Sequence, residues 1–105
     1  MAKVIWGDPA LDDVRSVIEF VARDSPVYAE RLATAILNAP KRLERFPQSG
    51  SVVPEFQMES IRELICNSHR IIYQIRGDVC YVVAVVHSSR DFLQAVDQER
   101  FDLQQ

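Results

Sequence analysis

The sequence predicts an α+β protein: an N-terminal strand, an antiparallel helical hairpin packed on one face of a mainly antiparallel four-stranded sheet, and a short C-terminal helix. Two observations carry this prediction. Apolar residues recur at helical spacing in the first half of the chain, and they alternate with a period of two after about residue 60. The 105 residues, 48% of them hydrophobic, suit one domain spanning residues 1–105.

The first part of the chain contains a short strand and the first helix. Residues 4–6 are an apolar triplet typical of a strand, and Asp8-Pro9 is a typical helix start because proline is tolerated in the first turn. The apolar side of the helix consists of residues spaced three or four apart, namely Leu11, Val14, Ile18 and Val21. We expect this side to face the sheet.

A second helix follows the sequence Asp24-Ser25-Pro26, which again joins a capping residue to a proline. Its apolar side is formed by Ala29, Leu32, Ala33, Ile36, Ala39 and Leu43. Pro40 lies inside this pattern and predicts a break near Asn38, because proline lacks a backbone donor and clashes with the preceding turn. The two helices, joined by a tight turn, make a helical hairpin.

Three antiparallel strands are predicted after a loop over residues 48–59. They cover residues 61–65, 69–76 and 79–87, and Gly77-Asp78 suits a two-residue hairpin turn. The register set by that turn gives an apolar face that we expect to cover the helices: Ile71, Tyr73, Ile75, Cys80, Val82, Ala84 and Val86. The opposite face is expected to be open, with Arg70 and His87 within reach of each other on it. Asp91 is expected to cap a short last helix.

The charge distribution restricts what the protein can bind. The formal net charge is −3, whereas nucleic-acid-binding domains are usually basic. Basic residues exceed acidic ones only between residues 61 and 90, which contain Arg62, Arg70, Arg76 and Arg90. Any contact with an anion is therefore expected in that segment.

Other features point to a cytoplasmic protein without cofactors. The apolar N-terminal stretch is too short for a signal peptide, and no apolar run approaches the length of a membrane span. Cys66 and Cys80 each lie in an apolar stretch and are expected to be buried, reduced thiols. Neither cysteine has a second ligand at zinc spacing, so we expect no metal site.

Several local motifs accompany this order of elements. They are Trp6 with residues 10–13 (ALDD), residues 43–50 (LERFPQSG), Pro54-Glu55, residues 61–64 (IREL), residues 69–73 (HRIIY) and residues 85–91 (VVHSSRD). Together they resemble the RelE/ParE superfamily of toxins from type II toxin–antitoxin (plasmid-stabilisation type) modules, over residues 4–93. The resemblance implies a cognate antitoxin protein as partner.

The superfamily contains two activities. Its RelE-like branch cleaves messenger RNA on the ribosome, while its ParE-like branch has no known nuclease activity and poisons DNA gyrase. For a nuclease, the resemblance implies a metal-independent site in which Arg70 supplies a cation and His87 a base, with Arg62 and Glu55 as weaker matches. The motif His87-Ser88-Ser89-Arg90-Asp91 is more similar to the ParE-like branch.

Two observations favour the ParE-like branch. No tyrosine follows His87, and the negative net charge does not suit docking on ribosomal RNA. We therefore expect a bacterial toxin that inhibits gyrase by protein binding, with Arg62, Arg70 and Arg90 as contacts for the antitoxin or the target. An antitoxin segment is expected to wrap the hairpin and the sheet edge, with acidic side chains near Arg70 and Arg90. A RelE-like ribosome-dependent endoribonuclease and a non-toxic family member acting as a binding partner remain alternatives.

Overall fold

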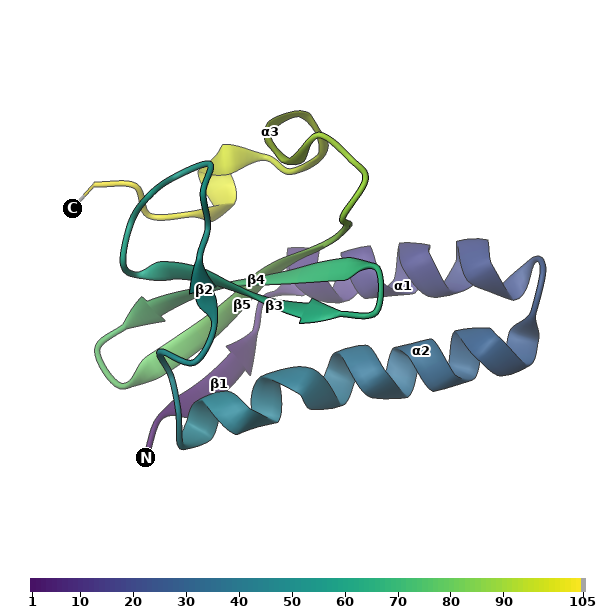
Figure 1. Ribbon diagram of the computed structural model, residues 1–105, viewed down its shortest axis with the longest axis horizontal. Helices are drawn as coiled ribbons and strands as arrows, with labels where there is room; N and C mark the ends of the chain where they lie inside the picture. The colour runs from purple at the N-terminus through teal and green to yellow at the C-terminus, as the bar shows by residue number, and fades with distance from the viewer. Residues whose placement is uncertain (105) are drawn as a thin grey trace.

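A computed structural model describes residues 1–104 and confirms the α+β class (Figure 1). The elements in chain order are β1 (Lys3–Trp6), α1 (Asp8–Ala22), α2 (Pro26–Asn38), a 3₁₀ helix (Ala39–Glu44), β2 (Ser51–Val52), β3 (Ile61–Cys66), β4 (His69–Arg76), β5 (Val79–His87), α3 (Phe92–Ala95) and a second 3₁₀ helix (Gln98–Arg100). The sheet has five strands in the order β1-β5-β4-β3-β2. Only β1 and β5 run parallel. The unpredicted fifth strand is the two-residue β2, which lies in the segment expected to be loop.

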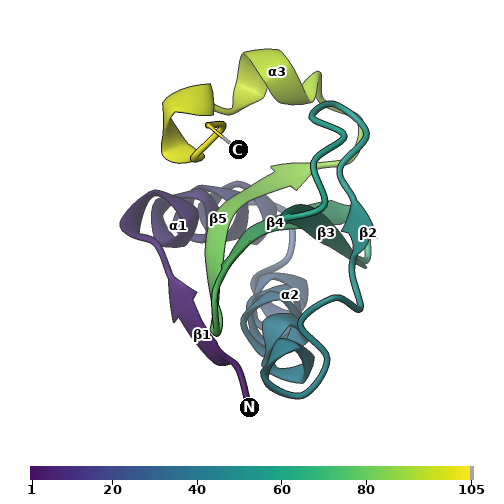
Figure 2. The same cartoon turned by 90° about the vertical axis from the view of Figure 1, so that its left-hand side faces the viewer.

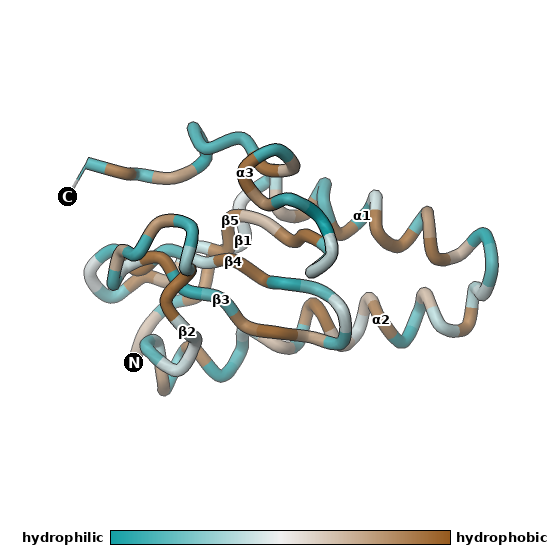
Figure 3. The backbone as a smooth tube through the Cα atoms, turned by 45° about the horizontal axis from the view of Figure 1, so that its top comes forward, coloured by the Kyte–Doolittle hydropathy of each residue, from teal (hydrophilic) through white to brown (hydrophobic). Residues whose placement is uncertain are grey.

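Both helices begin and end for local reasons. The N-cap of α1 is Gly7 rather than Asp8, and Pro9 occupies the first turn as expected. The Ser25 hydroxyl accepts a hydrogen bond of 3.1 Å from the Tyr28 amide and so caps α2. The predicted break near Asn38 is confirmed, because α2 ends there and Pro40 lies in the 3₁₀ helix. Figure 3 shows hydrophobic and hydrophilic residues alternating along both helices.

The sheet lies between two layers, with the helical hairpin on one face and the C-terminal segment on the other (Figure 2). The buried residues of the hairpin face are Ala10, Val14, Leu32, Ile36, Leu43, Leu64, Ile71, Tyr73, Cys80, Val82 and Val85. Leu11, predicted to belong to this core, is 37% exposed. A second cluster buries the other face and consists of Val53, Ile61, Ile72, Val83, Ala84, Val86, Phe92, Val96 and Phe101. The expectation that this second face is open was therefore wrong.

The predicted register of β4 and β5 holds near the turn and fails beyond it. Tyr73 pairs with Val82, but Ile72 pairs with Ala84, so Val83 is an extra residue in β5. Such a bulge reverses the side on which every later side chain points. Val85 therefore packs against the hairpin, while Ala84 and Val86 belong to the second cluster, the opposite of the prediction.

Side chains from distant parts of the chain satisfy the backbone around the bulge. Strand β1 ends beside Val82, so the edge of β5 beyond it has no neighbouring strand. There the Asp13 carboxylate accepts a hydrogen bond of 3.0 Å from the Val85 amide. Arg100 donates to the Val83 carbonyl at 3.3 Å and pairs with Asp13 at 2.8 Å. The pair Asp13–Arg100 thus supports the bulge and anchors the C-terminal segment.

Candidate functional site

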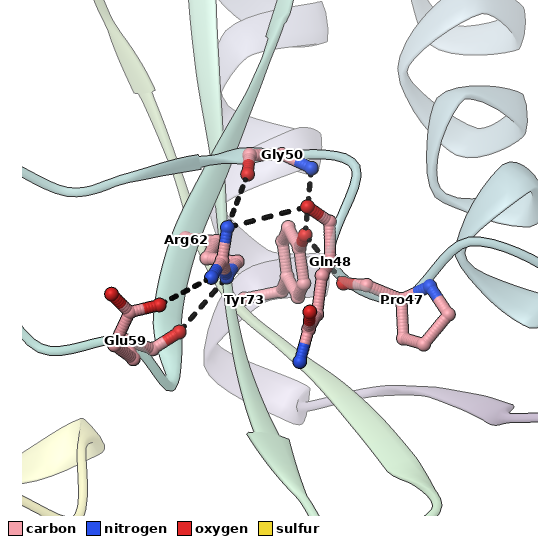
Figure 4. Close-up of polar contacts among 6 residues, drawn as sticks. All are labelled: Pro47, Gln48, Gly50, Glu59, Arg62 and Tyr73. Carbon is pink, nitrogen blue, oxygen red and sulfur yellow. Dashed lines mark hydrogen bonds and ion pairs between the residues drawn. The ribbon is translucent and has the colours of Figure 1, made fainter.

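Arg62, one of the predicted site residues, ties loops to the sheet (Figure 4). Its Nη2 pairs with Glu59 Oε2 at 2.7 Å, and its Nε donates to the Glu59 carbonyl at 2.8 Å. Its Nη1 donates to the carbonyls of Gly50 (2.9 Å) and Gln48 (3.2 Å). The side chain is 12% exposed and every guanidinium nitrogen has an acceptor. Arg62 is therefore committed to holding the loop and is not free to contact a phosphate.

Tyr73 completes this arrangement from β4. Its hydroxyl donates to the Pro47 carbonyl at 2.7 Å and accepts from the Gly50 amide at 3.0 Å (Figure 4). Gly50 has no room for a side chain, because an added Cβ would lie 2.6 Å from the Glu63 carbonyl oxygen and 2.7 Å from the Tyr73 hydroxyl. The motif at residues 43–50 therefore has a structural explanation, since Pro47 and Gly50 are held by the Tyr73 hydroxyl.

Arg70 is enclosed by two carboxylates on the C-terminal face. Its Nη1 and Nη2 form a two-pronged pair with Glu55 at 2.9 and 2.8 Å, and its Nε contacts Glu63 Oε1 at 2.5 Å. The guanidinium also lies 5.0 Å from the centre of the Phe92 ring. The hydrogen bond from Arg70 lowers the pKa of Glu55, and the pKa of Arg70 is raised by the same bond. With one cation against two carboxylates, this site is negative overall.

His87 lies at the end of β5, directly opposite His69. The two rings are nearly perpendicular, with centroids 5.1 Å apart. His87 Nδ1 accepts a hydrogen bond of 3.0 Å from the Ser89 amide and lies 2.7 Å from the Ser89 hydroxyl oxygen. His69 is only 7% exposed, and within residues 1–104 its Nδ1 has no hydrogen-bond partner. Burial, and then the neighbouring His87, lower the pKa of His69.

Both histidines line a groove of about 750 Å³ between the hairpin and the end of the sheet. In Figure 1 both helices extend beyond the β3–β4 turn, and the groove lies beside this overhang. We call it the hairpin groove; its lining is Asp13, Ser16, Val17, Phe20, Val21, Tyr28, Leu32, Ser68, His69, Val85, Val86, His87, Ser89 and Arg90. Arg90 is exposed and forms no ion pair within the described part of the chain.

Comparison with known proteins decides the family. Residues 4–92 match the family described as "ParE toxin of type II toxin-antitoxin system, parDE". The chain belongs to the ParE toxin family. Toxin RelE2 of Caulobacter vibrioides is 26% identical over 91 residues, which is 86% of this chain and 99% of RelE2. A solved structure described as the chromosomal ParDE TA system from P. aeruginosa has a TM-score of 0.69 at 17% identity, over 83% of this chain and 96% of that one; this likeness is one of fold.

In this ParE family toxin, the predicted site residues do not form one site. Arg70 and Glu55 are in contact, but Arg70 and His87 point to opposite faces of the sheet. The prediction that they share a face was wrong because the bulge at Val83 shifts β5 by one residue. Sequence reasoning also attached no role to His69. The feature that could have indicated a role for His69 is its pairing with His87, and this pairing follows only when the register of β4 and β5 is known.

Three further observations concern metal ligands, cysteines and membrane helices. Within residues 1–104, no three or more His, Cys, Asp or Glu side chains gather in a way that could hold a metal ion. Cys66 and Cys80 are free, and burial raises the pKa of both thiols. No helix in the described chain has the length and apolar character needed to cross a membrane.

Proposed function

We propose that this ParE family toxin inhibits DNA gyrase by binding it, and that a cognate antitoxin neutralises it by occupying the hairpin groove. One observation carries this proposal: the cation and the titratable group that a nuclease of this fold would use lie on opposite faces of the sheet. The proposal includes a single domain over residues 1–105, action in the cytoplasm and no cofactor.

The environment of Arg70 argues against RNA cleavage. A ribonuclease needs a base beside the 2′-hydroxyl and cations beside the phosphate. Arg70 is 11% exposed and its donors already contact Glu55 and Glu63. A phosphate would have to displace these carboxylates, both of which carry charge of its own sign. Arg62 offers no replacement, since its donors hold backbone carbonyls and Glu59.

The hairpin supplies a surface suited to a protein partner. At its tip Phe20 is 66% exposed, Val27 63% and Tyr28 48%. Apolar side chains gathered beside a groove are typical of a surface that binds another protein segment. We therefore keep the expectation that the antitoxin wraps the hairpin, and revise its charge partners: Arg90 remains available for an acidic side chain, whereas Arg70 does not.

The test adds purified protein to two reactions in parallel. In a gyrase supercoiling assay we expect relaxed DNA to accumulate in proportion to the protein added. In a translation extract we expect messenger RNA to stay intact, as mapped by primer extension. Cleaved message with normal supercoiling would overturn the proposal in favour of the RelE-like alternative. No effect in either reaction would instead support a non-toxic binding partner.

A further inference from the structure

The buried ring of His69 has one nitrogen atom without a hydrogen-bond partner in the described chain. It is more than nine-tenths buried, yet its Nδ1 contacts no acceptor or donor within residues 1–104. Buried polar atoms are nearly always hydrogen-bonded, so an orphan atom needs an explanation. His69 lies at the start of β4 and lines the hairpin groove, so a partner bound in the groove would lie beside this ring.

His87 and Arg90 lie at the same end of the groove. His87 Nδ1 is occupied by Ser89, which leaves Nε2 for a partner. Arg90 follows in the turn, held by a hydrogen bond of 3.1 Å from its amide to the His87 carbonyl. The same end is closed by the Ser88 amide, which donates to the Ser68 carbonyl at 2.8 Å. His69, His87 and Arg90 therefore lie together at one end of the groove, and within residues 1–104 no ion pair engages Arg90.

Within residues 1–104, Asp13 is the one carboxylate that lines the hairpin groove. The titratable and charged residues facing the two histidines are Asp13 from α1, Tyr28 from α2, Arg90 after β5 and Cys66, the β3 neighbour of His69. Asp13 is the only carboxylate among them, and it is engaged by Arg100 and by the Val85 amide. The Cys66 thiol is neutral at physiological pH because burial raises its pKa.

We propose that this end of the hairpin groove binds one acidic side chain of the antitoxin, held by His69, His87 and Arg90. The inference rests on the proposed antitoxin partner. A carboxylate accepts several hydrogen bonds at once, so it can accept from Arg90, from His87 Nε2 and from His69 in its protonated form. Apolar side chains of the same segment would fill the rest of the groove against Val17 and Leu32. Such a lining, in a protein of net charge −3, does not suit a nucleic acid.

Binding of an acidic side chain at this end of the groove should be accompanied by proton uptake. In the free protein burial holds His69 neutral, whereas a bound carboxylate favours the imidazolium form. The pKa of His69 is then higher in the complex than in the free toxin, so the complex takes up protons as it forms. Affinity should rise as the pH falls from about 8 to about 6, the range in which histidine titrates.

The experiment is calorimetry of the purified toxin with its cognate antitoxin at about pH 6 and about pH 8, in two buffers that differ in ionisation enthalpy. We expect net proton uptake and binding that is tighter by about tenfold at the lower pH. Arg90→Gln and His69→Gln should each weaken binding by about tenfold, and His69→Gln should also reduce proton uptake. Arg45→Gln, which removes an exposed arginine outside the groove, is the matched control and should change neither quantity.

The outcomes separate this inference from the proposed function. A tight complex with equal affinity at both pH values and no proton uptake overturns the carboxylate site and leaves the antitoxin proposal standing. No complex at either pH overturns both. If His69→Gln does not fold, NMR titration of the histidine rings in the wild-type complex decides instead. A His69 pKa that is not higher in the complex than in the free toxin overturns the inference.

Discussion

The two faces of the sheet differ in whether their charged and polar side chains have partners within the protein. On the C-terminal face, Arg70 is enclosed by Glu55, Glu63 and the Phe92 ring. On the hairpin face, within residues 1–104, the Nδ1 atom of His69 has no hydrogen-bond partner and Arg90 forms no ion pair. The first face is closed and its charges stabilise the fold, while on the second face the exposed Arg90 is available to another molecule.

This contrast shows why motif similarity alone does not locate a site. Arg62 and Arg70 both lie in motifs that resemble those of a toxin superfamily, and both serve this chain as internal clamps. Arg90 carries the same charge, yet it is exposed in a turn. The availability of an arginine depends on which carboxylates and carbonyls the fold brings beside it.

The largest expected effect tests whether the C-terminal face is a true core. Phe92 is 2% exposed and packs edge-on against Phe56, with ring centroids 5.7 Å apart. Phe92→Ala should lower the free energy of unfolding by about 3–5 kcal/mol, as measured by urea denaturation. Phe20→Ala, at an exposed position in the hairpin groove, is the control and should change it by less than about 0.5 kcal/mol. Equal losses in the two variants would contradict the contrast between the faces.

The next effect compares two arginines. Arg70→Met leaves Glu55 and Glu63 without their cation in a poorly hydrated site and should cost about 3 kcal/mol of stability. Arg90→Met removes a solvated charge and should cost less than about 0.5 kcal/mol. Thermal denaturation followed by circular dichroism measures both. A fully stable Arg70→Met protein would mean that the carboxylate cluster does not hold the C-terminal face.

The smallest effect is a difference in pH dependence between the faces. The folded-state pKa of Glu55 is lowered, so its stabilisation is present above the unfolded value of about 4.3 and is lost as the pH falls through the folded value. His69 also has a lowered folded-state pKa, and its contribution is lost on acidification from about pH 6.5. Urea denaturation between about pH 7.5 and pH 3 should show both steps. His69→Gln should remove only the upper step; an unchanged upper step would show that another group titrates there.

Much of the fold follows from local patterns. Helical spacing, the capping residue Ser25 and the break before Pro40 each predict their element from neighbouring residues. The register along the whole length of β4 and β5 could not be predicted, because the backbone around the bulge is bonded to Asp13 and Arg100, which lie 87 positions apart. The prediction that Arg70 and His87 form one site was wrong for the same reason. One inserted residue moved His87 to the other face, and the partners of Arg70 come from two other segments of the chain.

The C-terminal segment illustrates a related difficulty. Sequence reasoning predicted a short helix after Asp91, and α3 is present, but Phe92, Val96 and Phe101 are buried. The side chain of Gln74 also bonds this segment, accepting from the Asp102 amide at 3.0 Å. A truncation after Asp91 would therefore expose the second core, and loss of toxicity in such a variant would report unfolding rather than a lost target contact.

The central claim, that the toxin acts by binding rather than by cleaving RNA, is tested most directly by the toxicity of His87→Ala. The measurement is growth of cells that express this variant and the wild type at equal soluble levels, without antitoxin. His87 is exposed at a strand end, so its loss should leave the fold intact. We predict growth arrest within a few-fold of that caused by the wild type. Loss of toxicity by about 10²-fold or more in a folded protein, the effect of removing a catalytic acid–base group, would contradict the account.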